Sequence, residues 1–291
     1  MRTIAILLPI LLALVGFLVA AAVRPQPTSG IEPGSRLSSV RRRTSLWRWG
    51  GVALGLLLAV GVVQIDGALG RGVLLAAPLF ALGVLVGVIA GELRIAAPAT
   101  EARSAPLEVR RVRDYLPRHL MKAVAGATVT LGVLLVAATA VGSPDDLGRA
   151  GRSLVRACSD VMTSSSSPWP GSFYSLPLAA IVVGGLAAAA FALQQVVRRP
   201  RQGEDVRSDD ILRHSAAAAV VAASGILVAV PLAGTSAIAG IALFGSPCPM
   251  WWTTTLGWTL VVSAAGATVV AIWCATVLVL PDRTSTRHEV G

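Results

Sequence analysis

Seven long apolar stretches alternate with polar segments along this chain. Each stretch has at least the roughly 17 residues that a helix needs to cross the hydrocarbon core of a bilayer, and none carries an ionisable side chain in its middle third. The pattern predicts an all-α fold, an integral membrane helical bundle of about seven transmembrane helices, with residues 1–291 forming a single transmembrane domain. The predicted spans are residues 3–23, 49–65, 72–91, 120–141, 176–197, 215–235 and 256–280.

The polar segments differ in their arginine content. Residues 24–48, 92–119 and 198–214 are basic, whereas residues 142–175 form the largest loop on the opposite side of the predicted bundle. With the tails included, twenty of the 25 basic residues fall on one side. Because cytoplasmic loops of membrane proteins are enriched in Lys and Arg, this bias predicts that the N-terminus lies outside and the C-terminus inside.

The composition and the charge of the chain indicate which partner to expect. Hydrophobic residues make up 54% of the chain and charged residues 14%, which excludes an ordinary soluble domain. A net charge of +10 would suggest nucleic acid for a soluble protein, but here the arginines flank apolar spans. We therefore expect contact with anionic lipid headgroups at the inner face, and no nucleic acid. The candidate headgroup contacts are Arg41, Arg42, Arg43, Arg110, Arg111 and Arg113.

The first span has a second interpretation. Its basic start, its apolar run and the small residues at 19–22 also fit a cleaved signal peptide. Cleavage and export would place the basic segment 24–48 outside, against the charge bias, so a retained helix is favoured.

The sixth stretch is too long for one simple span. Residues 215–244 would extend about 45 Å as a single helix, and Pro231 lies inside them. Proline lacks the N–H that a helix interior uses. The sequence therefore predicts a kink, or a partly re-entrant segment through Gly234, Thr235 and Ser236.

Glycines in the third stretch recur every four residues, at Gly83, Gly87 and Gly91. Residues four apart share a helix face, and glycines there let a second backbone approach closely. The second stretch offers Gly51 and Gly55 as a counterpart. We expect this face to be a helix contact, inside the bundle in preference to between two copies.

Two of the three cysteines fall in predicted outer loops. Cys158 and Cys248 could form a disulfide there, since that side of a plasma membrane is oxidising. The alternative is that both are small unpaired residues. Cys274 lies within the seventh span.

The outer loop contains one candidate element. Leu154, Val155, Cys158 and either Val161 or Met162 would share one face of a short amphipathic helix over residues 149–162. The serine-rich residues 163–168 would follow as a flexible break.

A weak internal repeat precedes two of the spans. Asp114, Arg118 and His119 have the same spacing as Asp209, Arg213 and His214. Helix capping by the Asp and interfacial anchoring by the Arg explain the pattern. A duplicated hairpin unit would also produce it, but three shared residues do not establish one.

The sequence offers no catalytic motif, no metal-ligand spacing and no cofactor-binding fingerprint. We therefore expect no enzyme, no cofactor and no catalytic or metal-binding residues. The leading hypothesis is a non-catalytic scaffold or accessory subunit, with a membrane protein or a second copy as its partner. The alternative is a small-solute transporter or channel that uses a broken sixth helix, with Thr235 and Ser236 lining its path.

The basic segment Arg110-Arg111-Val112-Arg113-Asp114-Tyr115-Leu116-Pro117-Arg118 lies between two apolar spans of an arginine-rich, lysine-poor chain. In this it resembles a group of uncharacterised multi-pass membrane proteins of actinobacteria. The resemblance implies a bacterial plasma membrane and no assigned activity.

Overall fold

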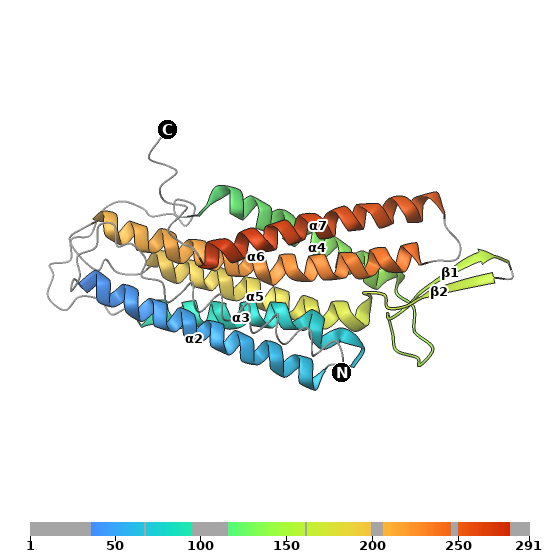
Figure 1. Cartoon of the computed structure of the whole chain (residues 1–291), viewed down its shortest axis with the longest axis horizontal. Coiled ribbons are helices and arrows are strands. Elements are labelled where there is room, and N and C mark those ends of the chain that lie inside the picture. The colour runs from blue at the N-terminus through green and yellow to red at the C-terminus, as the bar shows by residue number, and fades with distance from the viewer. Residues whose placement is uncertain are drawn as a thin grey trace.

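A computed structural model describes residues 36–66, 68–94, 116–160, 162–198, 206–245 and 250–279. These residues form an up-and-down bundle of long helices with a β-hairpin that projects from one end (Figure 1). The elements in chain order are α2 (Arg36–Ile65), the 3-10 turn η1 (Ala68–Gly70), α3 (Arg71–Leu93), α4 (Arg118–Val141), β1 (Leu154–Ser159), β2 (Met162–Ser166), α5 (Ser172–Arg198), α6 (Val206–Phe244) and α7 (Trp251–Val279).

Six helices of the described part are long and apolar enough to cross a membrane. They correspond to the second to seventh predicted spans, and the predicted span 3–23 lies outside the described residues. We call the end that carries β1 and β2 the hairpin end. The other is the arginine end, where α2 and α4 begin with Arg36 and Arg118 and α5 ends at Arg198.

Helix α6 is the central element of the bundle. Its most apolar stretch is 83% buried inside the protein, whereas the corresponding stretches of the other spans are 11 to 44% buried. Helices α3, α4, α5 and α7 all pack against it. A helix that is apolar on every side has no polar face to turn to water, and its many alanines let four neighbours approach closely.

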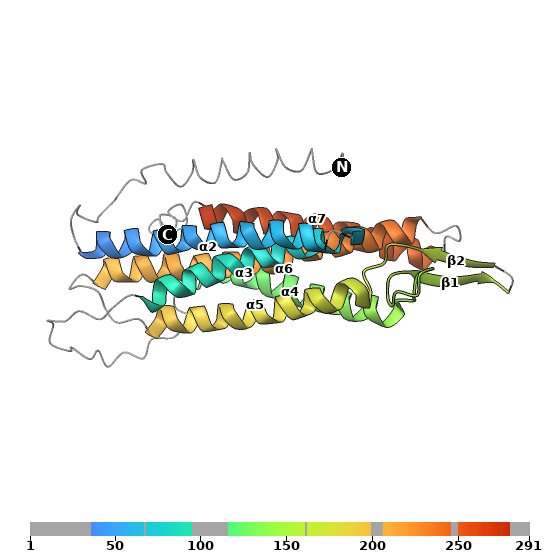
Figure 2. The ribbon, with the colours of Figure 1, turned by 90° about the horizontal axis from the view of Figure 1, so that it is seen from below.

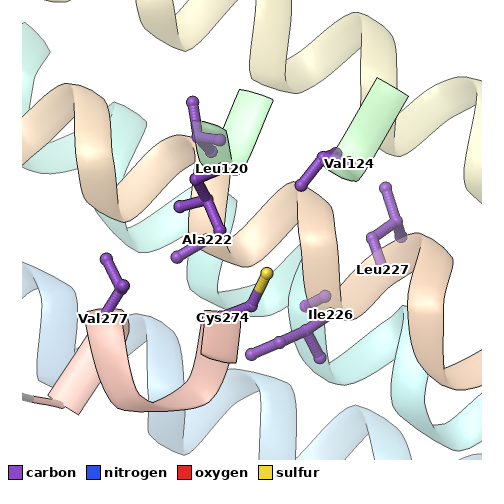
Figure 3. Close-up of a cluster of buried hydrophobic side chains, with 9 residues drawn as sticks. Leu120, Val124, Ala222, Ile226, Leu227, Cys274 and Val277 are labelled. Carbon is purple, nitrogen blue, oxygen red and sulfur yellow. The ribbon is translucent and has the colours of Figure 1, made fainter. Parts of the chain in front are cut away.

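One core cluster shows how the neighbours meet around α6. Leu120 and Val124 of α4 lie over Ala222, Ile226 and Leu227 of α6, with Cys274 and Val277 of α7 on the other side (Figure 3). A Cβ atom added at Gly225 would collide with the sulfur of Cys274. The α6–α7 contact therefore depends on a residue without a side chain at this position.

Helices α2 and α3 form a close glycine contact. Gly83 and Gly87 of α3 lie directly against the backbone of Gly55 and Gly51 of α2, and a Cβ atom at any of these four would meet backbone atoms. Gly91 is also buried. The structure thus places the glycine face of α3 inside the bundle.

The predicted re-entrant segment in the sixth span is wrong, whereas the predicted kink at Pro231 stays a prediction. Helix α6 runs without interruption from Val206 to Phe244, with Pro231 inside it. The hydroxyl of Thr235 donates to the carbonyl oxygen of Pro231 at 2.7 Å, and both Thr235 and Ser236 are fully buried. Dense packing on all sides keeps the helix continuous although one backbone donor is missing.

Two boundaries at the arginine end also differ from the prediction. Helix α2 begins at Arg36, so Arg41, Arg42 and Arg43 belong to a helix and not to a loop. Helix α6 begins at Val206, which makes the second half of the predicted loop 198–214 helical. Helices that extend past the hydrocarbon have water or headgroups around their polar turns, so hydropathy alone does not mark their ends.

Candidate functional site

The largest described structure outside the helices is the segment from Gly142 to Gly171, which we call the platform. It connects α4 to α5 and contains the antiparallel strands β1 and β2, with Leu154 opposite Ser166 and Arg156 opposite Ser164. The hairpin extends beyond the helix ends along the length of the bundle (Figure 2).

The predicted amphipathic helix over residues 149–162 and the flexible break after it are therefore wrong. Burial along β1 alternates, because Leu154 is buried whereas Val155 is exposed. Serine and threonine have low helix propensity, so the serine-rich run of β2 pairs more readily as a strand. Gly148 and Gly151 adopt positive φ angles and turn the chain before the strand starts.

Asp145 organises the first half of the platform. Its Oδ1 accepts hydrogen bonds from the backbone N–H of Leu147 and Arg149, at 3.1 and 2.9 Å. Its Oδ2 accepts from Nε of Arg149 at 2.7 Å and from Nη1 of Arg152 at 2.6 Å. Desolvation raises the pKa of Asp145, but the hydrogen bonds from Arg149, Arg152 and Leu147 outweigh it and hold that pKa well below its usual range.

Two aromatic side chains fix the platform to the helices. The indole Nε1 of Trp169, which is buried, donates to the carbonyl oxygen of Ala138 at 2.8 Å. The hydroxyl of Tyr174 donates to the carbonyl oxygen of Leu69 at 2.9 Å and thereby joins the start of α5 to the turn between α2 and α3. The platform is thus fixed to the end of α4, and the start of α5 is fixed to the turn between α2 and α3.

A second set of contacts surrounds the ring of Phe173. The guanidinium carbon of Arg71 lies 4.7 Å from the ring centroid and that of Arg152 lies 6.0 Å from it. Arg71 is also paired with the carboxylate of Asp66, through Nε at 2.5 Å and Nη2 at 2.9 Å. Cation–π contacts and a bidentate ion pair therefore connect the platform to the α2–α3 turn.

The platform encloses a polar cavity of about 160 Å³ beside the Asp145 network. Its walls are mainly charged and hydroxyl side chains, with no apolar pocket of the kind that small-molecule sites usually have. Among the described residues no group of three His, Cys, Asp or Glu side chains could hold a metal ion. The lining residues are Asp145, Asp146, Leu147, Arg149, Arg152, Ser153, Ser165 and Ser167.

The cysteines differ in state. Cys158 of β1 is disulfide-bonded, and Cys274 is buried and free. Cys248 lies outside the described residues, so the Cys158–Cys248 pairing stays a prediction. The chain has three cysteines, and Cys248 is the one other than Cys158 and Cys274.

At the arginine end the structure reveals a residue that the sequence analysis did not single out as a site. Arg213 is completely buried, and its Nη1 donates to the carbonyl oxygens of Val196 and Val197 at 2.8 and 3.1 Å. It therefore caps the last turn of α5 from α6. The side chains of Arg41, Arg42 and Arg43, and the whole of Arg110, Arg111 and Arg113, lie outside the described part, so their headgroup contacts stay predictions.

Comparison with protein-family models, with curated proteins and with solved structures found no match. The class of the protein therefore follows from its own helices. Within the described residues, six apolar helices of membrane-spanning length support a multi-pass membrane protein built as a helical bundle. The resemblance to actinobacterial membrane proteins stays a prediction.

The Asp145 network predicts a measurable effect on the platform. Replacing Asp145 with asparagine leaves Arg149 and Arg152 without their anion, and we expect trypsin to cleave after them on the order of tenfold faster. Asp146→Asn is the matched control, because Asp146 is exposed beside the same cavity. Equal cleavage rates for the two variants would show that the network does not order the platform.

The same network predicts little dependence on pH between 7 and about 4. The pKa of Asp145 is depressed in the folded protein, so its stabilising contribution is present above the unfolded pKa, near 4, and is lost only as pH falls through the lower folded value. Protection from an acid-tolerant protease should therefore persist down to about pH 4.

Proposed function

We propose that this protein is a non-catalytic scaffold or accessory subunit of a bacterial plasma membrane, and that the platform contacts its partner. The proposal rests on the continuity of α6 and on the burial of two of its hydroxyl side chains. Thr235 and Ser236, the residues that would line a solute path through a broken helix, are fully buried in a continuous one. A transporter needs polar groups accessible at membrane depth, and these two are not.

The membrane-spanning sequences support the same conclusion. Ion-coupled carriers usually place a titratable side chain near the middle of a span, because the coupling ion needs a partner there. The middle thirds of the spans in this chain hold none.

The shape of the platform supports its role as the contact element. Val155, Ala157, Thr163 and Ser165 are exposed on one face of the hairpin and form a surface without charge. The opposite face carries Leu154, which is buried. An ordered, uncharged surface held beyond the helix ends suits a protein partner better than water alone.

We further infer that the arginine end faces the cytoplasm and its anionic lipids. Eleven of the fifteen basic residues in the described part lie at that end, whereas the hairpin end balances four arginines with four aspartates. The four arginines are Arg71, Arg149, Arg152 and Arg156, and the four aspartates are Asp66, Asp145, Asp146 and Asp160.

The test compares two changes in one native gel of mild-detergent membrane extracts. We expect the wild-type chain to migrate as a complex larger than its own 29.9 kDa plus detergent. The double variant Thr235→Ala, Ser236→Ala should keep that complex, because neither hydroxyl is accessible to a partner or a solute. Replacing residues 155–165 by a Gly-Ser loop of equal length should release the bare chain.

A solute-swelling assay addresses the alternative directly. Proteoliposomes that contain the wild-type chain should swell in glycerol or urea no faster than protein-free liposomes. Faster swelling that the double alanine variant abolishes would overturn the scaffold proposal, and so would a complex that survives loss of the hairpin but not of the two hydroxyls.

A further inference from the structure

The hairpin face that contacts the bundle carries an arginine and a serine side by side. Arg156 of β1 and Ser164 of β2 are register partners, so their side chains lie on the same face of the two strands. The guanidinium carbon of Arg156 lies 5.7 Å from the ring centroid of Trp252, in the first turn of α7. This pair is therefore located between the hairpin and the start of a membrane-spanning helix.

Three polar side-chain atoms of this pair lack hydrogen-bond partners within the described part of the chain. Nε and Nη2 of Arg156 and Oγ of Ser164 are all buried from solvent, and none of the three is hydrogen-bonded. Ser164 as a whole is only 4% exposed. Buried polar groups are almost always paired, and an unpaired buried cation is especially costly, so these atoms indicate an absent acceptor.

Another arginine of the same end shows which acceptor fits. Arg71 uses the same two nitrogens, Nε and Nη2, to hold both carboxylate oxygens of Asp66. These nitrogens form one edge of the planar guanidinium and match two oxygens of a carboxylate or a phosphate. Arg149 and Arg152 share the carboxylate of Asp145. For Arg156 no ion pair is found among the described residues, so its edge is free for an external oxyanion.

The surroundings favour phosphate over carboxylate. A phosphate group offers a third oxygen, which can accept from the hydroxyl of Ser164 while two others accept from Arg156. The first turn of α7 presents the positive end of a helix dipole, which attracts anions. Trp251 and Trp252 are exposed at this helix end, as tryptophans are at the level of lipid headgroups.

We propose that Nε and Nη2 of Arg156 and Oγ of Ser164 bind a phosphate group, supplied by a lipid headgroup or by free phosphate. Arg156 is half-buried as a residue, so part of its side chain already reaches solvent beside the hairpin. The ring of Trp252 then shields one side of the ion pair from water, which strengthens it.

The test uses delipidated full-length protein in a maltoside detergent, whose headgroup carries no phosphate. Inorganic phosphate is titrated at constant ionic strength in one arm, and short-chain phosphatidylglycerol is titrated in the other. Binding is followed by the rise in unfolding temperature and by tryptophan fluorescence. We expect saturable binding in at least one arm, with binding weakened about 100-fold in Arg156→Gln and about five- to tenfold in Ser164→Ala.

Two control variants test whether weaker binding comes from loss of the site itself, and not from loss of net charge or from disturbed packing of the strands. Arg118→Gln removes the same charge from an exposed residue at the arginine end, and Ser165→Ala removes a hydroxyl from the exposed face of the hairpin. Both should bind as the wild type does. Saturation with phosphatidylglycerol alone assigns the phosphate to lipid, and saturation with inorganic phosphate assigns it to the free ion.

The proposal is overturned if neither arm saturates, or if Ser164→Ala binds as tightly as Ser165→Ala. Comparing Ser164→Ala with Ser165→Ala tests the proposal even where Arg156→Gln does not fold. Both variants keep the guanidinium of Arg156, and each removes one hydroxyl from the same strand.

Discussion

Leucine in place of Gly87 is expected to remove folded protein from a detergent extract. A Cβ atom at this position would lie 2.5 Å from Cα of Gly51 and 2.6 Å from the carbonyl oxygen of Trp47. Both are backbone atoms of α2, so the clash is relieved only by moving a whole helix. We expect a loss of about 3 kcal/mol or more, because overpacking against backbone leaves no side chain free to adjust.

The neighbouring residue provides the control for this prediction. Val86 is 44% exposed on α3, so Val86→Leu should leave the yield unchanged. The measurement is the monodisperse fraction in size-exclusion chromatography together with the unfolding temperature. If both variants give the wild-type profile, the α2–α3 glycine contact is absent from the folded protein.

Removing the side chain of Arg213 should have the second largest effect. Arg213→Ala leaves the carbonyl oxygens of Val196 and Val197 without their donor and opens a cavity where the guanidinium was completely buried. We expect a loss of about 2 to 4 kcal/mol, from the unpaired carbonyls and the cavity together. Hydrogen exchange should rise first in the last turn of α5.

The internal repeat supplies a matched control. Arg118 has the same place in the shared Asp-x-x-x-Arg-His pattern, yet it is exposed at the start of α4. Arg118→Ala should therefore change stability by less than about 0.5 kcal/mol. Equal losses in the two variants would mean that both arginines act through the membrane interface and not through a helix cap.

The membrane helices were predictable from sequence because bilayer thickness imposes a length on every apolar stretch. Six predicted spans correspond to the six membrane-length helices of the described residues. The continuity of α6 was not predictable, because Pro231 breaks isolated helices, whereas four neighbouring helices hold this one in place. Local propensity and tertiary packing point in opposite directions here, and packing determines the result.

The platform was missed for a different reason. Leu154, Val155 and Cys158 fit one face of a helix and also fit a strand, and a six-residue run cannot distinguish the two periods. A better signal was the pair Gly148 and Gly151 before the run and the serines after it. The partners of Tyr174 and Arg213 are distant in sequence, so no spacing rule could have found them. Asp145 and Arg149 are four residues apart, and that pair was within reach of a spacing rule.

The central position of α6 has a consequence for how the chain is made. Membrane helices are inserted in the order of synthesis, so α2 to α5 enter the bilayer before α6. Of these four helices, α3, α4 and α5 pack extensively against α6. Until α6 arrives, α4 lacks its largest contact among the described helices, and its smaller contact with α5 and the hydrogen bond from Trp169 to Ala138 hold it. A ribosome stalled before residue 206 would thus leave α4 loosely associated in the lipid, and quality-control proteases would have a long interval in which to recognise it.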